Sequence, residues 1–251
     1  MKAAERHLKL REIFATQEFA DLETLCREVR ASESTLRRDL IALEKDGLLR
    51  RVHGGALGAR NREHLLDFAW QRGLMAEEKQ RIAVAAAALI EDGQTVLLDG
   101  GSTTAAVAQE LVGRSLHVVT NSLPIAEVFR EARRIELTLT GGFLYPRLGV
   151  MLGPFCEQML ASIAADVAVM GTGGVTASGF SNNNTLIVGS ERTMIHVSRK
   201  VIIVADHGKF GRAAMVPLAP LDVADVVVSD ADLAPSHQDL LREHGVEVRL
   251  A

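Results

Sequence analysis

Short runs of aliphatic and β-branched residues alternate with longer segments of helical character from Ala76 onward. Because these runs lack the apolar–polar alternation of a half-exposed strand, they indicate parallel strands buried on both faces of a sheet. Residues 76–251 therefore predict an α/β domain with a mainly parallel sheet and a core of its own. The expected strands are Thr95–Leu98, Leu116–Thr120, Ile135–Thr140, Val167–Met170, Val201–Ala205, Val226–Ser229 and Val246–Leu250. The expected helices are Glu77–Ile90, Leu123–Glu131 and the segment from the loop after Leu98 to Val112.

Residues 1–57 follow a different pattern, which predicts a small domain of three short helices and a strand pair. Apolar residues recur at helical spacing in Arg6–Phe14, Leu22–Val29 and Glu33–Lys45. Ser32 is expected to cap the third helix and Gly47 to end it. A basic strand and a glycine turn follow, at Leu48–His53 and Gly54–Gly55. Residues 58–75 are polar and irregular, which predicts a linker between the two domains.

Composition favours a globular protein, since 47% of the 251 residues are hydrophobic and 24% are charged. The longest apolar stretch, Ile82–Ile90, is far shorter than the ~20 residues of a membrane span. The first ten residues lack the apolar segment of a signal peptide. Two cysteines form neither a disulfide framework nor a four-cysteine zinc site, and the histidines lack metal-ligand spacing. We therefore expect a cytoplasmic protein with no membrane, metal or cofactor involved.

The formal net charge of −4 argues at first against a nucleic-acid partner. Residues 1–60, however, carry 12 Lys and Arg against 10 Asp and Glu, whereas residues 61–251 carry 16 against 22. The two parts differ in sign, so the average describes neither of them.

The break at Arg30–Ser32 separates two short helices, as in a helix-turn-helix. With its leucines turned inward, the third helix exposes hydroxyl groups near its start and two arginines, which suit base edges and phosphates in the major groove. Basic residues on the following strand suit a wing on the sugar–phosphate backbone. The same spacing also fits a protein-docking domain, but the clustered arginines favour DNA. The expected DNA contacts are Ser32, Ser34, Thr35, Arg37, Arg38, Arg50, Arg51 and His53.

The segment SESTLRRDLIALEKDGLLRRVHGGA resembles the signature of the DeoR family of bacterial transcription regulators. The resemblance implies a winged helix-turn-helix that binds double-stranded operator DNA, with Glu33–Lys45 as its recognition helix. Asp39 is expected to orient the arginines or to make a helix contact, since a carboxylate repels phosphate.

A loop rich in glycine and hydroxyl groups, Asp99–Thr104, follows one of the expected strands and opens a helix. Unpaired backbone N–H groups and the helix dipole make such a place a cradle for phosphate or carboxylate. The loop lacks the lysine of a P-loop and the spacing of a dinucleotide fingerprint. Because glycine-rich turns are common without a ligand, the loop by itself favours an ordinary tight turn between strand and helix.

Other loops are expected at the same edge, because the carboxyl ends of parallel strands converge on one crevice. Together they suit a polyhydroxylated anion, although Lys209 could equally be an exposed surface lysine. The asparagines at 182–184 suit hydroxyl recognition as well as a simple polar turn. The expected ligand-binding residues are Asp99, Gly100, Gly101, Ser102, Thr103, Thr104, Asn121, Gly171, Gly173, Asn182, Asn183, Asn184 and Lys209.

The segments ALIEDGQTVLLDGGSTTAAVAQEL, VVTNSLPIA, TGGFL and VIIVADHGKFGR look like successive blocks of the DeoR-family sensor domain. The resemblance implies a fold similar to ribose-5-phosphate isomerase and a site for phosphorylated sugars, with Asn121 and Lys209 facing the ligand. One block departs from the family, because many members carry Glu and Lys where this chain has Ile187 and Glu191. Related isomerases need a carboxylate base near that Glu, so Ile187 argues against catalysis and leaves the ligand's identity open.

We therefore expect a ligand-responsive repressor of carbohydrate metabolism genes, controlled by a phosphorylated sugar or related metabolite. A homodimer or homotetramer is expected, since one winged helix buries little surface and symmetric dimers match repeated half-sites. The alternative is an isomerase-like enzyme for sugar phosphates that carries an extra N-terminal docking domain, which the fold resemblance allows. A partner-binding adaptor is disfavoured by the arginine-rich helix and wing.

Overall fold

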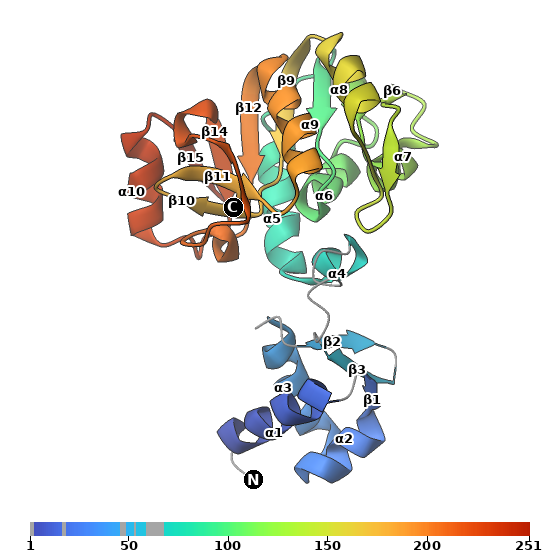
Figure 1. The fold of residues 1–251 in the computed structure, drawn as a ribbon, viewed down its shortest axis with the longest axis vertical. Helices are drawn as coiled ribbons and strands as arrows, with labels where there is room; N and C mark the ends of the chain where they lie inside the picture. Colours follow the sequence, from blue (N-terminus) through green and yellow to red (C-terminus); the bar gives the residue numbers. More distant parts are fainter. Residues whose placement is uncertain (1–2, 17–18, 46–48, 53, 59–67) are drawn as a thin grey trace. The chain divides into compact units, whose positions relative to one another are not determined.

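The computed structural model describes residues 3–16, 19–45, 49–52, 54–58 and 68–251 (Figure 1). The chain divides into two compact units, Met1–Met75 and Ala76–Ala251. Gly47, His53 and residues 59–67 of the expected linker lie outside the described residues. The end of the linker is not irregular as expected, because Phe68–Gly73 forms a short helix, α4.

The first unit combines three helices with a small antiparallel sheet. The helices are α1 (Ala3–Thr16), α2 (Leu22–Val29) and α3 (Glu33–Lys45). The strands are β1 (Phe19–Asp21), β2 (Leu49–Val52) and β3 (Gly55–Gly58), in the order β1-β3-β2. Leucines from all three helices form the core, as their spacing predicts. Strand β1 was not expected, because three residues carry no readable period and its pairing with β3 is a tertiary contact.

Local hydrogen bonds fix the sharp turn between α2 and α3. Asp21 caps α2 by accepting a hydrogen bond from the backbone N–H of Thr24 at 2.8 Å. Arg30 ends that helix in the left-handed region, at φ 49°, and its N–H donates to Cys26 O. Ser32 Oγ then accepts from the N–H of Thr35 at 3.4 Å, at the start of α3. These caps give the helix-turn-helix geometry that the sequence predicts.

The second unit is built on a seven-stranded sheet in which every neighbouring pair is parallel, in the order β15-β14-β12-β9-β4-β5-β6. The predicted fold class, a helix-turn-helix followed by a larger α/β domain, is confirmed. The strands are β4 (Thr95–Leu98), β5 (Leu116–Thr120), β6 (Ile135–Leu139), β9 (Ala165–Met170), β12 (Ser198–Val204), β14 (Val226–Ser229) and β15 (Glu247–Leu250).

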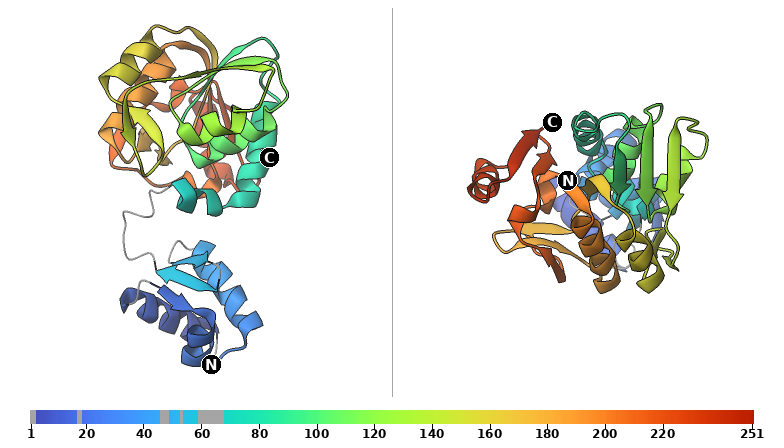
Figure 2. Two further views of the ribbon diagram at one scale, coloured as in Figure 1. Left: turned by 90° about the vertical axis from the view of Figure 1, so that its right-hand side faces the viewer. Right: turned by 90° about the horizontal axis from the view of Figure 1, so that it is seen from above.

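Helices cover both faces of this sheet (Figure 2). Helices α5, α6 and α7 pack in sequence against one another, and α8 packs on α9. The helices are α5 (Ala76–Ala87), α6 (Ser102–Glu110), α7 (Leu123–Phe129), α8 (Pro154–Ala161), α9 (Thr185–His196) and α10 (Pro235–Glu243). No helix in the described ranges is long and apolar enough to cross a membrane.

Two small antiparallel sheets stand beside the main sheet and were not expected from the sequence. One pairs β7 (Phe143–Tyr145) with β8 (Val150–Leu152). The other joins β10 (Gly174–Thr176), β11 (Gly179–Asn182) and β13 (Val216–Ala219). Their strands are only three or four residues long, too short to show a clear alternation in the sequence. They matter because β8 and β11 approach the carboxyl edge of the main sheet.

Candidate functional site

Helix α3 has one buried face and one exposed face. Leu36, Leu40 and Leu43 are buried, whereas Ser34, Arg37, Arg38 and Ile41 are exposed. At the start of the helix, Ser32 Oγ lies 3.2 Å from Ser34 Oγ and 2.9 Å from Thr35 Oγ1. The first turns of α3 therefore carry a cluster of hydroxyl groups and two exposed arginines.

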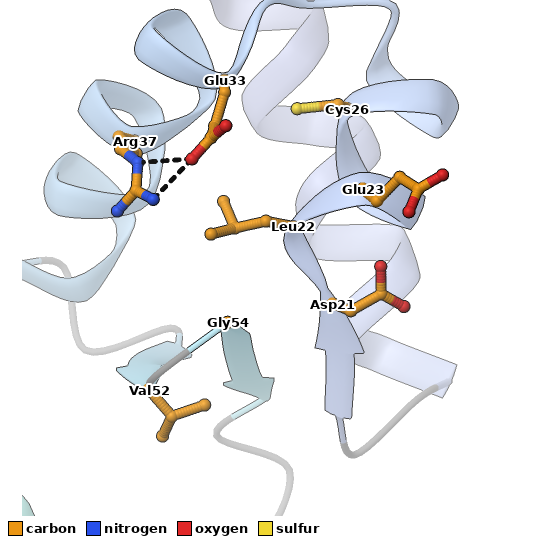
Figure 3. A pocket seen from close by; sticks show the side chains of 8 residues that line it. All are labelled: Asp21, Leu22, Glu23, Cys26, Glu33, Arg37, Val52 and Gly54. Carbon is orange, nitrogen blue, oxygen red and sulfur yellow. Dashed lines mark hydrogen bonds and ion pairs between the residues drawn. The ribbon is translucent and has the colours of Figure 1, made fainter.

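An ion pair holds the guanidinium of Arg37 on the surface of α3. Its Nε donates to Glu33 Oε1 at 3.0 Å, one helical turn away, and both side chains are more than half exposed. Arg37 and Glu33 also line a surface cavity of about 790 Å³ between α2, α3 and β2, together with Asp21, Leu22, Glu23, Cys26, Val52 and Gly54 (Figure 3). By contrast, Arg38 makes no hydrogen bond or ion pair with any described residue.

The basic strand β2 is tied to the end of α3. Glu44 accepts from the backbone N–H of Arg51 at 2.8 Å and from its Nε at 2.6 Å. Arg50 is half-buried in the same strand. His53, the third basic residue expected on the wing, lies outside the described residues.

Asp39 connects α3 to α1 and does not contact the arginines of α3. It accepts from Arg6 Nε at 2.6 Å and lies 3.1 Å from His7 Nε2. Burial by itself would raise the pKa of Asp39, but hydrogen bonds with Arg6 and His7 outweigh that effect and lower it. Of the two roles expected for Asp39, the structure shows the helix contact.

In the second unit, Asp99 stands at the end of β4 and is almost fully buried. Its Oδ2 accepts from the backbone N–H of Gly171 at 3.2 Å, which joins the loops after β4 and β9. Burial raises the pKa of Asp99 to about 6, while hydrogen bonds from the N–H groups of Gly171 and Gly100 counteract part of this rise. Gly100 has no room for a side chain, since a Cβ would lie 2.1 Å from Val150 Cγ1.

The start of α6 follows directly. Thr104 forms the helix cap, because its Oγ1 accepts from the N–H of Gly101 and donates to the carbonyl oxygen of Gly101, both at 2.8 Å. Ser102 and Thr103 are nearly buried, and their hydroxyls bond to no other residue in the described part of the chain. Two hydroxyl groups and the first N–H groups of α6 are thus available at one place.

Asn121 follows β5, the neighbour of β4 in the sheet. Its Nδ2 donates to the carbonyl oxygen of Met151 at 3.1 Å, whereas its Oδ1 is buried and has no hydrogen-bond partner within the described ranges. An orphaned buried acceptor is rare in folded proteins and marks a place where a donor is missing.

The three asparagines at 182–184 have different roles. Asn184 caps α9 by accepting from the N–H of Leu186 at 2.8 Å. Asn182 accepts from the N–H of Asn183 at 2.9 Å, and its Nδ2 donates to Glu191 Oε1 at 2.6 Å. The run is therefore partly a polar turn and partly a support for a buried carboxyl group.

Glu191 is a candidate site residue that the expected set omits. It is 1% exposed, and burial, reinforced by the nearby Asp99, raises its pKa well above the usual range, against the opposing hydrogen bond from Asn182. In the sequence, Glu191 stood out because many members of the resembled family carry Lys at this position. The sequence alone does not show that Glu191 interacts with Asp99. Ile187, one turn earlier, packs with Val150 and Leu152 in an apolar cluster.

Lys209 lies on the short 3-10 turn after β12, next to Asp206. Burial lowers the pKa of Lys209, and Asp206 opposes this effect. Lys79 of α5 was not expected here, because one lysine in an amphipathic helix normally reaches solvent. It is 5% exposed, and burial lowers its pKa to about 8, with Asp206 raising it and Lys209 lowering it further. Two lysines therefore share one carboxylate.

A histidine and two aspartates lie close together beside this turn, with possible ligand atoms of His207, Asp230 and Asp232 within 4.8 Å of one another. The carboxylate of Asp230 is already occupied. It binds the backbone N–H and Nδ1 of His207, both at 2.7 Å, and accepts from the N–H of Asp232 at 3.1 Å. The arrangement fixes the turn that carries Lys209.

Two segments of the chain match known domain families: residues 6–61 match the DeoR-like helix-turn-helix domain, and residues 74–231 match the DeoR C terminal sensor domain. The chain is 32% identical over 257 residues to the glycerol-3-phosphate regulon repressor of Escherichia coli (strain K12), with complete coverage of both proteins. It is 31% identical to the HTH-type transcriptional repressor GlcR of Bacillus subtilis (strain 168), with 90% of this chain and 88% of that protein covered. A solved ribose 5-phosphate isomerase A from Methanocaldococcus jannaschii aligns with 54% of this chain and 55% of its own length, at 17% identity and a TM-score of 0.39.

Proposed function

Because the chain belongs to the DeoR family of transcription regulators, we propose that it represses carbohydrate metabolism genes and that a phosphorylated sugar or related metabolite controls its binding to operator DNA. Two relatives are named as repressors, one of them of a glycerol-3-phosphate regulon, which supports both parts of the proposal. The first unit is the DNA-binding part and the second unit is the sensor.

The exposed face of α3 supports the DNA-binding role. Arg38 extends into solvent without an ion pair among the described residues, and Arg37 is held only by an exposed pair that costs little to break. We assign base and phosphate contacts to these arginines and to the hydroxyls of Ser32, Ser34 and Thr35. Arg50 and Arg51 of β2 would contact the backbone of the same DNA segment.

A gel-shift titration on the DNA upstream of the protein's own gene tests this role. Specific binding at moderate salt, competed by the same DNA and not by scrambled DNA, is expected. Folded protein that shows no such preference would contradict the proposal.

The start of α6 is the observation that carries the effector site. Ser102 and Thr103 place unpaired, nearly buried hydroxyls where the helix presents its free N–H groups, which is the arrangement that binds phosphate. Asn121 would accept a hydrogen bond from the ligand through its unpartnered Oδ1. Lys209 and Lys79 would add positive charge at the same edge of the sheet. Thr104 would act indirectly, because its hydroxyl already forms the cap.

A thermal-shift screen of sugar phosphates against inorganic phosphate tests this site. A ligand of the proposed site should raise the Tm of the wild-type protein and have less effect on the double variant Ser102→Ala, Thr103→Ala. Equal shifts in both proteins would remove these hydroxyls from the site.

A role as a sugar-phosphate isomerase is the competing function. Ile187 lies within an apolar cluster with Val150 and Leu152, so it supplies no base for moving a proton α to a carbonyl. Incubation with ribose 5-phosphate should therefore give no ribulose 5-phosphate. Turnover that a Ser102→Ala variant loses would reverse this ranking.

We further propose a symmetric homodimer or homotetramer, because one small recognition unit buries too little DNA surface for tight specific binding. Light scattering coupled to size-exclusion chromatography measures the mass directly. A monomer that still binds its operator specifically would contradict the proposal.

A further inference from the structure

Two carboxyl groups meet in the interior of the sensor unit, at the carboxyl edge of its sheet. Asp99 ends β4 and is 6% exposed, and Glu191 of α9 is 1% exposed. Asp99 and the Asn182 amide act on Glu191, and the backbone N–H groups of Gly171 and Gly100 act on Asp99. None of the lysines or arginines in the described ranges is among them. Two buried carboxyl groups that interact are not both charged unless a cation accompanies them.

Hydrogen-bond donors are also too few here. Glu191 Oε1 accepts from Asn182 Nδ2 at 2.6 Å, but the buried Glu191 Oε2 has no partner among the residues that the structure describes. The same holds for the buried Asn121 Oδ1, which follows β5, the neighbour of β4 in the sheet. A buried acceptor left in this state costs free energy that a bound donor would recover. Glu191 Oε2 and Asn121 Oδ1 thus lack donors, and no positive charge among the described residues acts on the two carboxyl groups.

A group that would supply a donor and positive charge to this acid pair differs from the phosphate proposed to bind at the start of α6. A hydroxyl group would supply a donor but no charge, whereas a protonated amine supplies up to three donors and one positive charge. Asp99 stands only three residues before Ser102, so the two places are at most about 11 Å apart along the backbone. One small molecule can therefore reach both.

We propose that the effector is an amino sugar phosphate, whose ammonium group binds between Asp99 and Glu191 while its phosphate binds at the start of α6. This inference rests on the proposed effector function and assigns its ligand class. Glu191 is the residue that selects the amine, and the hydrogen bond from Asn182 positions the carboxyl group of Glu191.

Matched ligand pairs test the inference with the full-length wild-type protein. Isothermal titration is carried out with glucosamine 6-phosphate and glucose 6-phosphate, and with galactosamine 6-phosphate and galactose 6-phosphate. In at least one pair, the amine should bind ten-fold or more tightly than its neutral partner. N-acetylglucosamine 6-phosphate, whose nitrogen carries no charge, should lose that advantage.

The variant Glu191→Gln tests the assigned residue. It keeps the shape of the side chain, so binding of the neutral sugar phosphates should persist while the preference for the amine falls to less than three-fold. Glu157→Gln on the adjacent helix α8 is the matched control, because Glu157 lies against Gly189 of α9 and is not among the groups that act on Asp99 or Glu191. The control should retain the wild-type preference.

The outcomes separate this inference from the function on which it rests. Neutral sugar phosphates that bind as tightly as their amines would overturn the inference and leave the effector function standing. An amine preference that Glu191→Gln retains would overturn the assignment of the amine to Glu191. No binding of any sugar phosphate would overturn both.

Discussion

Arg6 of α1 binds Asp39 of α3 through two parallel hydrogen bonds, from Nε to Oδ2 at 2.6 Å and from a terminal nitrogen to Oδ1 at 3.1 Å. The second oxygen also lies 3.1 Å from His7 Nε2. Asp39 therefore fixes the recognition helix to the first helix from its buried side. The orientation of α3, and so of its exposed arginines, depends on a carboxylate that never faces the DNA.

Replacing Asp39 by Asn should lower the Tm of the DNA-binding unit by several degrees, because the fork of Arg6 loses its charged partner. Circular dichroism of the full-length protein follows this transition. Operator binding at a temperature where the variant is folded should remain within a few-fold of wild type. A large loss of affinity without loss of stability would indicate a direct DNA contact by Asp39.

Glu33 should weaken DNA binding by holding Arg37 and by placing negative charge on the recognition face. Glu33→Gln is therefore expected to raise operator affinity about two- to five-fold, the size of an exposed ion pair. Glu23→Gln, on the exposed surface of α2, provides the comparison. Gel shifts at two salt concentrations measure the effect, and unchanged affinity would show that the pair does not restrain Arg37.

Thr104 and Ser102 should separate stability from ligand binding. Thr104→Val removes both hydrogen bonds of a fully buried hydroxyl and should cost about 1–3 kcal/mol of unfolding free energy. Ser102→Ala should change that energy little, yet reduce the Tm increase given by a sugar phosphate. Chemical denaturation and thermal shift measure the two effects, and the opposite pattern would assign the cap to Ser102.

The acid pair predicts that the sensor unit loses stability as pH rises. Asp99 has an ordinary pKa of 3.8 and a folded pKa of about 6, and the pKa of Glu191 is also raised, so the folded state holds more protons in between. The stabilising protonation is complete below the unfolded pKa values and is lost as pH rises through the folded ones. Glu191→Gln should flatten this fall between pH 4 and 7, which thermal unfolding at a series of pH values measures. Parallel Tm curves for both proteins would contradict the coupling.

Lys79 should stabilise a bound phosphate, although its charge lowers the stability of the ligand-free protein. Its pKa is lowered to about 8, so a charged Lys79 destabilises the fold near neutral pH, an effect that disappears as pH rises from 8 to 10.5. Lys79→Met should raise the Tm of the ligand-free protein by a few degrees and reduce the increase given by inorganic phosphate. Lys200→Met, at the opposite end of β12, serves as the control. A variant that binds phosphate like the wild type would place Lys79 outside the site.

Helices with regular apolar spacing and strands made of unbroken apolar runs were predictable from the sequence. Helices α2 and α3 and the strands β4, β5 and β14 have the predicted bounds. The helices show apolar residues at helical spacing, and the short β-branched runs alternate with helical segments as in a parallel sheet. Strand β1 and the two small sheets were missed, since short strands are defined by partners that are distant in the chain. The loop residues at the sheet edge were predictable for a related reason, because parallel strands fix where their ends meet.

The sequence by itself determined the fold class, the family and the arginine-bearing face of α3, since these follow from local spacing and local motifs. Only the tertiary structure decided which polar side chains lose their water. Burial makes Lys79 and Glu191 of two helices candidate site residues, and the hydroxyl of the buried Thr104 forms a helix cap. Desolvation depends on what packs around a side chain, and that information is distributed over strands and helices far apart in the chain.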